Sequence, residues 1–404
     1  MHDRPTPEGP PEPPAALSRL LEGRGGGPDF AGLERYLAAE LDPEGLPRRW
    51  AVAQWWSALG LLAAVDGAPA LAPRVEGLFR SALRFARAGG AEVFGPPGTP
   101  TGRGSLLRRL AARSADPGLA EVVRRWAPSA STRDADPSPP PLPAAASAEV
   151  ALAALRPDWS ARGDVLAIDQ RGPGLVELIG GGRHLLGPSW ELGPSASTPM
   201  PTAWSTGMYA DCAEWAFRRG RVGVTRTAVL LRNKGMALIA EQRDRPDATP
   251  MAVELAPGVE AATVGDSRLV ALGTGRGASA KVAPLGLPAE ADRSRVGGLA
   301  VEGRSLVLSQ PSAAPRSWLP ILVTWTGRGP TGWRSLTVAE KSAACPPGVA
   351  FAARVSFGKG DGLVVYRSLV TPALRSFLGH QTNARFLVGT FDEDGNVKVL
   401  LRLD

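Results

Sequence analysis

Hydrophobic residues follow two different periods along the chain. Up to about residue 126, apolar positions recur every three or four residues, which is typical of a helix with one buried face. The segment "PDFAGLERYLAAEL" (28–41) shows this pattern through Phe30, Leu33 and Leu37. After about residue 160 the period becomes two, and short apolar runs alternate with Gly, Pro and Asp turn signals. The pattern therefore predicts helices first and strands afterwards.

Three further segments of the first part are predicted to be helical. The segment 47–66 has apolar residues nearly all round and should form a buried helix that begins at Pro47. The segment 72–90 is amphipathic and should end at Gly89–Gly90. The segment 105–126 should form two short helices separated at Pro117. Together these helices predict a small bundle.

The period-two region is long enough for a large β domain. It contains about fifteen candidate strands with few helical segments between them, so the strands should pair antiparallel. A single sheet of that width would curl or split, which favours two packed sheets; a propeller is a weaker alternative because no exact repeat is visible. The predicted fold class is therefore α+β and multidomain, with a small N-terminal α-helical bundle followed by a large antiparallel β-sandwich.

Composition completes the predicted domain organisation. Residues 1–14 are rich in Pro and should form a disordered arm, and residues 127–147 form a linker rich in Pro, Ser and Ala. The helical domain then covers 15–126 and the sandwich 148–404. The first residues lack a basic and an apolar signal region, so a cytoplasmic protein is expected, or a secreted one if the start codon is misassigned. The most apolar stretch, 50–65, is too short for a membrane span.

Charge and rare residues narrow the functional classes. The formal charge is +7 and the pI about 10, but the arginines are scattered and no basic block carries interleaved aromatic residues, so nucleic acid is not expected as a partner. Cys212 and Cys345 stand far apart, which excludes a zinc finger and favours two reduced thiols over one disulfide. The histidines are His2, His184 and His380. We expect neither a metal nor another cofactor.

One stretch resembles a known family. In "WSTGMYADCAEWAF" (204–217) a Trp, a Tyr-x-Asp and an acidic–aromatic pair follow one another, and "VTRTAVLLRNKGMALIAEQ" comes next. This order resembles the opening strands of the C-terminal β-sandwich of heparinase II/III-like polysaccharide lyases, with Glu241 where the family usually has Asp. The resemblance covers about residues 200–404.

The resemblance implies an acidic, uronate-containing polysaccharide as ligand, cleaved in the family by β-elimination. That reaction needs a base, typically Tyr or His, and a group that neutralises the carboxylate. In the family these groups lie mainly on a long helical toroid before the sandwich. Here the preceding helical part has about 110 residues with Tyr36 as its one tyrosine and without histidine. No catalytic residue is therefore carried over from the family. The sequence is compatible with a lyase and also with a protein that has no lyase activity.

The richest polar cluster is "YRSLVTPALRSFLGHQTNARF" (366–386). Tyr366 or His380 could act as a base, and Arg375 or Arg367 could hold a carboxylate. The alternative is two strands and a polar loop, in which His380 caps a turn and the arginines are solvated.

Two aromatic residues are further candidates for ligand binding. Trp333 follows a Gly-rich turn, and Tyr209 lies in the stretch that carries the resemblance. Either ring could stack on a sugar, or pack in the core as aromatic rings often do. Two functions remain open: a carbohydrate-associated protein that binds acidic polysaccharide, or a non-catalytic structural or protein-interaction module.

Overall fold

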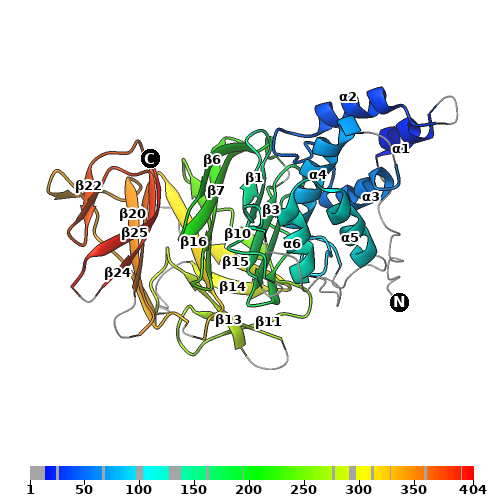
Figure 1. The fold of residues 1–404 in the computed structure, drawn as a ribbon. Helices are drawn as coiled ribbons and strands as arrows, with labels where there is room; N and C mark the ends of the chain where they lie inside the picture. The colour runs from blue at the N-terminus through cyan, green and yellow to red at the C-terminus, as the bar shows by residue number, and fades with distance from the viewer. Residues whose placement is uncertain are drawn as a thin grey trace, which may run out of the picture. The chain divides into compact units, whose positions relative to one another are not determined.

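The computed structural model describes residues 14–404 with the exception of 24–26, 66–68, 97–102, 127–137, 161–162, 194, 275–277, 291–296, 311–313, 328, 359–361 and 393. The predicted arm up to residue 13, with His2, and the linker residues 127–137 lie outside the described residues. The chain divides into two compact units, Met1–Glu149 with Asp158–Gly163 and Val150–Pro157 with Asp164–Asp404 (Figure 1).

The first unit is helical, as predicted. Trp55 and Phe85 meet edge to face in its core with 5.2 Å between ring centroids, and Leu33 and Leu37 are fully buried. A two-residue strand, β1 (Ala145–Ala146), follows the helices. The helical elements are α1 (Ala15–Glu22), α2 (Phe30–Glu40), α3 (Val52–Leu62), the 3-10 turn η1 (Pro69–Leu71), α4 (Ala72–Arg84), α5 (Arg103–Arg113) and α6 (Pro117–Trp126).

One helix start differs from the prediction. α3 begins at Val52 rather than at Pro47. The residues before it form a turn, because the Asp42 carboxylate accepts a hydrogen bond of 2.8 Å from the backbone N–H of Leu46, and Pro47 bridges to Leu41. A side chain that caps a local turn has thus replaced the first helical turn.

One helix end also differs. α4 ends at Arg84, before the glycine pair. Gly89 and Gly90 both adopt positive φ, at 87° and 86°, in a turn that the 2.7 Å hydrogen bond from Arg87 N to Ala91 O closes. The glycines therefore make the turn after the helix and not its last residue.

The second unit consists of antiparallel sheets. A first sheet runs in the order β2 (Leu152–Leu155), β3 (Val165–Asp169), β4 (Leu175–Gly180), β5 (Arg183–Leu186). A three-stranded sheet runs β10 (Met251–Glu254), β15 (Ser305–Ser309), β14 (Gly298–Glu302). The eight-stranded sheet runs β11 (Glu260–Thr263), β12 (Val270–Gly273), β13 (Ala278–Pro284), β16 (Ser317–Thr324), β9 (Met236–Arg243), β8 (Val222–Leu231), β7 (Ala210–Arg219), β6 (Met200–Thr206).

Two more sheets complete this unit. The five-stranded sheet runs β17 (Gly332–Ser335), β20 (Ala350–Ser356), β21 (Gly362–Ser368), β24 (Phe386–Phe391), β25 (Val397–Leu403). The four-stranded sheet runs β19 (Ala343–Ala344), β18 (Ala339–Glu340), β22 (Arg375–Phe377), β23 (His380–Thr382).

The five-stranded sheet is covered on both faces (Figure 1). One face packs on the eight-stranded sheet, where Leu238 and Leu322 meet Val365 and Phe386 in the main core. The other face packs on the four-stranded sheet around Phe377. The predicted helical part with a large antiparallel β-sandwich is therefore confirmed.

The stretch 204–217, which carries the sequence resemblance, forms a hairpin. β6 ends at Thr206 and β7 begins at Ala210, and Cys212 then packs in the main core while Phe217 packs in a separate small cluster. Cys212 and Cys345 are both free thiols, as the predicted reduced state requires. Among the described residues, no helix has the length and apolar character needed to cross a membrane.

Candidate functional site

Tyr366, Arg375 and His380 lie close together on β21, β22 and β23. Arg375 Nη1 is 3.4 Å from the Tyr366 hydroxyl and 2.6 Å from Ser368 Oγ. The Tyr366 ring stacks on Phe377 with 5.2 Å between centroids, and Phe377 lies 5.5 Å from the His380 ring. The structure thus brings these three sequence candidates into one cluster.

Burial restricts what this cluster can do. Tyr366 is fully buried and Arg375 is 3% exposed, with its Nε 2.8 Å from Glu340. Burial alone would lower the pKa of Arg375, but hydrogen bonds with Tyr366 and Glu340 raise it, so the guanidinium stays charged. Burial, and then the charge of Arg402, lower the pKa of His380. A polymer on the surface does not reach the Tyr366 hydroxyl in this conformation, and catalysis by Tyr366 or His380 stays a prediction.

Arg367 belongs to a different cluster. Because successive residues of a strand point to opposite faces, Arg367 turns away from Tyr366 and into the main core. There its Nη1 is hydrogen-bonded to Glu214 and its Nε donates to Gln242 at 2.6 Å. Arg385 pairs with the same Glu214 carboxylate at 2.8 Å. Arg367 therefore neutralises a buried carboxylate, and in this conformation it is not open to a ligand.

Trp333 is also a core residue in this structure. It is 7% exposed, and its indole N–H donates a hydrogen bond of 2.8 Å to the carbonyl oxygen of Leu287. A ring held in this way presents little face to a sugar.

Tyr209 is the exposed candidate. It lies in the turn between β6 and β7, is 39% exposed, and has the Lys398 ammonium 5.0 Å from its ring centroid. Its carbonyl oxygen accepts a hydrogen bond of 2.8 Å from the N–H of Arg232, the first residue after β8. Tyr209 is therefore fixed beside the β8–β9 turn and the start of β25.

A groove of about 500 Å³ lies at this end of the sandwich. The β8–β9 turn, the residues after β16 and the β24–β25 turn surround it. We call it the lysine groove, and its polar lining residues are Asn233, Lys234, Thr326, Thr390, Asp392, Asn396 and Lys398. The chain has five lysines in total, and two of them line this groove.

Local sequence explains the two turns. Asn233 and Gly235 adopt positive φ, at 58° and 61°, and a Cβ at Gly235 would lie 2.3 Å from the Thr326 side chain. The turn "RNKG" therefore needs these residue types. On the other side, the Asp392 carboxylate accepts the Asn396 backbone N–H at 2.8 Å, and this bond lowers the pKa of Asp392.

The groove has an aromatic floor. Phe391 and Phe357 line it, and the Phe391 ring lies directly over Gly362, where a Cβ would be 1.8 Å from the ring. The Arg354 guanidinium lies 4.1 Å from the centroid of Phe391. Two ammonium groups, with amides and hydroxyls around them, suit an anionic ligand rich in hydroxyl groups. Sequence reasoning missed Lys234 and Lys398, although the scarcity of lysine was a usable signal.

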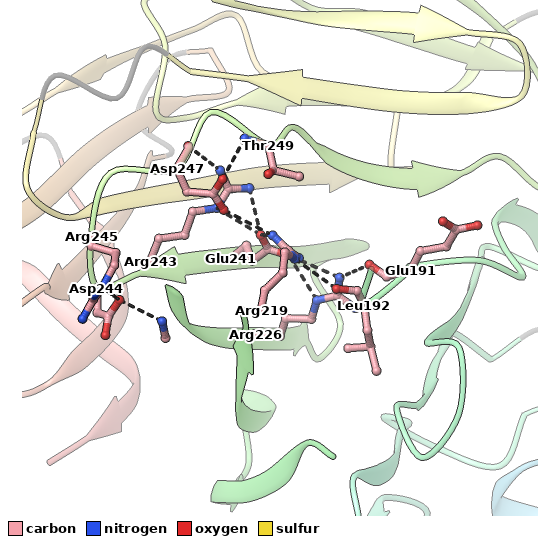
Figure 2. A network of polar contacts seen from close by, with 11 residues as sticks. Glu191, Leu192, Arg219, Arg226, Glu241, Arg243, Asp244, Arg245, Asp247 and Thr249 are labelled. Carbon is pink, nitrogen blue, oxygen red and sulfur yellow. Dashed lines mark hydrogen bonds and ion pairs between the residues drawn. The ribbon is translucent and has the colours of Figure 1, made fainter. Parts of the chain in front are cut away.

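A buried ion network occupies the face of the eight-stranded sheet that points away from the main core (Figure 2). Glu241 lies on β9, at the position that carries the sequence resemblance. It is fully buried and pairs with Arg219 at 3.0 Å, Arg226 at 3.2 Å and Arg243 at 2.9 Å. Arg226 also donates to the carbonyl oxygen of Glu191. The network ties the segment before β6 to the sheet.

The arginines control the protonation of Glu241. Burial would raise the pKa of Glu241, but the positive charges of Arg226, Arg219 and Arg243 lower it to about 2. Burial lowers the pKa of Arg226 to about 10, which still leaves it charged at neutral pH. The network is closed to ligands and its role is structural. Within the described part of the chain, no three His, Cys, Asp or Glu side chains are grouped so that they could hold a metal ion.

Comparison with known proteins identifies solved structures of the same fold. The chain matches the heparan sulfate lyase of Pedobacter heparinus with a TM-score of 0.57, at 12% identity over 88% of this chain and 61% of that one. It matches a structure of heparinase III with a TM-score of 0.56, at 10% identity over 81% of this chain and 61% of that one. A heparinase III with methylated lysines gives a TM-score of 0.57 at 9% identity.

These likenesses confirm the predicted resemblance at the level of the fold. At 88%, the matched share exceeds residues 200–404, so it includes part of the chain before the predicted segment. The chain spans about 61% of the lyase structure that it matches. No family model and no curated protein matches the sequence.

Proposed function

We propose that this protein binds an acidic polysaccharide in the lysine groove. The observation that carries the proposal is the placement of two of the five lysines in one open groove with amide and hydroxyl side chains, with Tyr209 beside Lys398. The fold, which it shares with structures named as heparan sulfate lyase and heparinase III, supports a carbohydrate ligand.

Each part of the groove has a role in this proposal. Lys234 and Lys398 are exposed and attract carboxylate or sulfate groups, while the Tyr209 ring holds the Lys398 ammonium in place. Asn233, Thr326 and Asn396 provide donors and acceptors for sugar hydroxyls. Asp392 keeps its negative charge, because Asn396 supplies only neutral donors, so Lys234, Lys398 and Asp392 together give the groove lining one net positive charge.

We favour binding over cleavage because of where the candidate bases lie. The Tyr366 hydroxyl is buried against Arg375, and the buried arginines Arg367 and Arg375 are paired with Glu214 and Glu340. A β-elimination needs a base and a neutralising group that both reach the substrate. In this conformation neither group of this cluster does.

Binding to heparan, alginate and pectin-type polymers tests the proposal. Titration calorimetry at low salt should detect at least one of them, and the Lys234→Gln, Lys398→Gln double variant should bind about tenfold more weakly, since loss of two contacts of this kind costs about 1–2 kcal/mol. Higher salt should weaken binding of the unchanged protein, because the attraction is screened.

The control is Lys341→Gln, which removes one positive charge, against two in the double variant, from the exposed turn between β18 and β19. It should leave the affinity unchanged. Equal losses in the control and the double variant would mean a nonspecific charge effect and would reject the groove as the site. Absorbance of newly formed unsaturated uronate should stay flat in the same mixtures, and a rise would show cleavage.

A protein-interaction role is the second candidate. Exposed apolar side chains occur on β6, in the β6–β7 turn and on β25, namely Met200, Trp204, Met208 and Val399. β6 and β25 are edge strands of their sheets. Exposed apolar side chains on edge strands are typical of a contact surface. No binding to any polymer, together with self-association that Trp204→Ser abolishes, would favour this role.

A further inference from the structure

Two arginines lie directly opposite each other at the edge of the five-stranded sheet. β17 is the edge strand and pairs antiparallel with β20, and the register places Arg334 opposite Arg354. Residues opposite each other in such a pair project from the same face, with their Cβ atoms about 5 Å apart. Two positive charges are thus held side by side, which destabilises the strand pair unless another group compensates them.

No acidic side chain compensates this pair among the residues that the structure describes. Neither guanidinium forms an ion pair or donates a hydrogen bond there, and Arg354 Nε is buried without a partner. The Arg354 guanidinium lies 4.1 Å from the centroid of the Phe391 ring. An aromatic face stabilises a cation, but it neither cancels the charge nor accepts all of the guanidinium N–H groups.

The two arginines face an open hollow of about 350 Å³. Gly332 and Ser356 form the next opposite pair on the same face and also line it. The space beside Gly332 is open, because a Cβ there would have no other atom within 4 Å. Arg334 is exposed and Arg354 is half-buried. A small group can therefore approach both guanidinium groups and the Ser356 hydroxyl from solvent.

We infer that Arg334 and Arg354 together bind a tetrahedral oxyanion, a phosphate or sulfate group. A guanidinium donates two parallel hydrogen bonds to the oxygens of such a group. A carboxylate has two oxygens and satisfies one guanidinium in this way, whereas a tetrahedral oxyanion has enough oxygens for two. No residue that lines this hollow also lines the lysine groove, so the inference does not rest on the proposed function.

Thermal unfolding of the full chain in phosphate, sulfate, acetate or chloride, at equal ionic strength, tests this inference. At about tenfold excess over the dissociation constant, phosphate or sulfate should raise the midpoint of the unchanged protein by about 2–4 °C relative to chloride, and acetate should not. Arg334→Gln should lose this rise. In chloride the same variant should unfold at a slightly higher temperature than the unchanged protein, because the repulsion is gone.

Controls separate this site from general effects of salt and from the lysine groove. Phosphate and sulfate stabilise most proteins by exclusion from the surface, and the response that remains in Arg334→Gln measures that part. Arg183→Gln removes one charge from an exposed position on β5 and should keep the full rise. The Lys234→Gln, Lys398→Gln double variant should keep it too, whatever happens to polysaccharide binding.

The source of the oxyanion is read from a comparison of glucose 6-sulfate with inorganic sulfate. A larger rise with the ester would identify a sulfate group carried by a sugar, and a larger rise with the inorganic ion would identify a free oxyanion. Equal rises in the unchanged protein and in Arg334→Gln would overturn the site. So would a response to acetate as large as that to phosphate, or no rise above chloride in any of these anions.

Discussion

At the scale of single residues, Glu241 is the carboxylate that compensates the charges of three arginines. Its carboxylate is fully buried and faces three arginines, and Asp247 is the other acid near them, 3.6 Å from Arg219. Removing one member of a buried ion network leaves the others without compensation, which costs far more than loss of an exposed pair. Glu241 is therefore the counter-ion of the buried arginines, and its loss should destabilise the sheet.

Glu241→Gln should lower the free energy of unfolding by about 3–5 kcal/mol. The amide keeps the shape of the carboxylate but removes its charge from beside Arg219, Arg226 and Arg243. Urea unfolding followed by fluorescence measures the effect, with Glu260→Gln on the exposed strand β11 as the control. A loss below about 1 kcal/mol would mean that the network contributes little.

The same carboxylate predicts a pH dependence. Its pKa is about 2 in the folded protein and 4.5 ordinarily, so the unfolded chain binds the extra proton between these values. The contribution to stability is full above about pH 4.5 and is lost as the pH falls towards 2, a change of about 3 kcal/mol. In Glu241→Gln this part of the acid dependence should disappear, and an unchanged acid profile would contradict the assignment.

At the scale of elements, the neighbouring strands β21 and β24 depend on one glycine. Gly362 lies at the start of β21, and the Phe391 ring at the end of β24 covers it. Phe391 also forms the floor of the lysine groove. Gly362 has no side chain, and the Phe391 ring fills the space that a side chain would take. The packing of the two strands and the shape of the groove therefore depend on the same residue.

Gly362→Ala should destabilise the protein by about 1–3 kcal/mol, because its Cβ would lie 1.8 Å from the ring and force Phe391 to move. Polysaccharide affinity should fall with it. Thermal unfolding and the binding titration measure both effects. Gly298→Ala on β14 has open space around the new Cβ and serves as control. An unchanged polysaccharide affinity in Gly362→Ala would mean that the position of Phe391 does not affect ligand binding.

At the scale of the whole molecule, each of the two units has its own buried residues. Trp55 and Phe85 lie in the helical unit, and Phe386 and Val365 lie in the main core of the β unit. We expect two unfolding transitions in calorimetry, since domains with separate cores often unfold separately. Glu241→Gln should lower the midpoint of one transition only. A single transition whose calorimetric and van't Hoff enthalpies agree would contradict this expectation.

The fold followed from the sequence because the hydrophobic period changes once and turn residues recur regularly. The region after about residue 160, where the period is two, forms strands such as β8, β9 and β24. Burial was harder to predict, because alternation separates Tyr366 from Arg367 but does not reveal that both faces of their sheet are covered. The lysine groove could not be predicted either, because its residues come from turns that are far apart in the sequence.

Lys234 and Lys398 are far apart in sequence, and sheet packing brings their turns together. Neither turn shows a motif that names its partner. By contrast, the 366–386 cluster could be recognised because its residues are close in sequence. Closeness in sequence does not indicate exposure, and residues chosen in this way proved to be buried.

The scarcity of lysine has a practical consequence. A reagent that modifies primary amines can react with five side chains in this chain and with its terminal amine, and it leaves the arginines untouched. Two of those five amines border the same groove. Any molecule lodged there would shield both at once, so a peptide map of modified amines would report occupancy without a label on the ligand and without knowledge of its chemical identity.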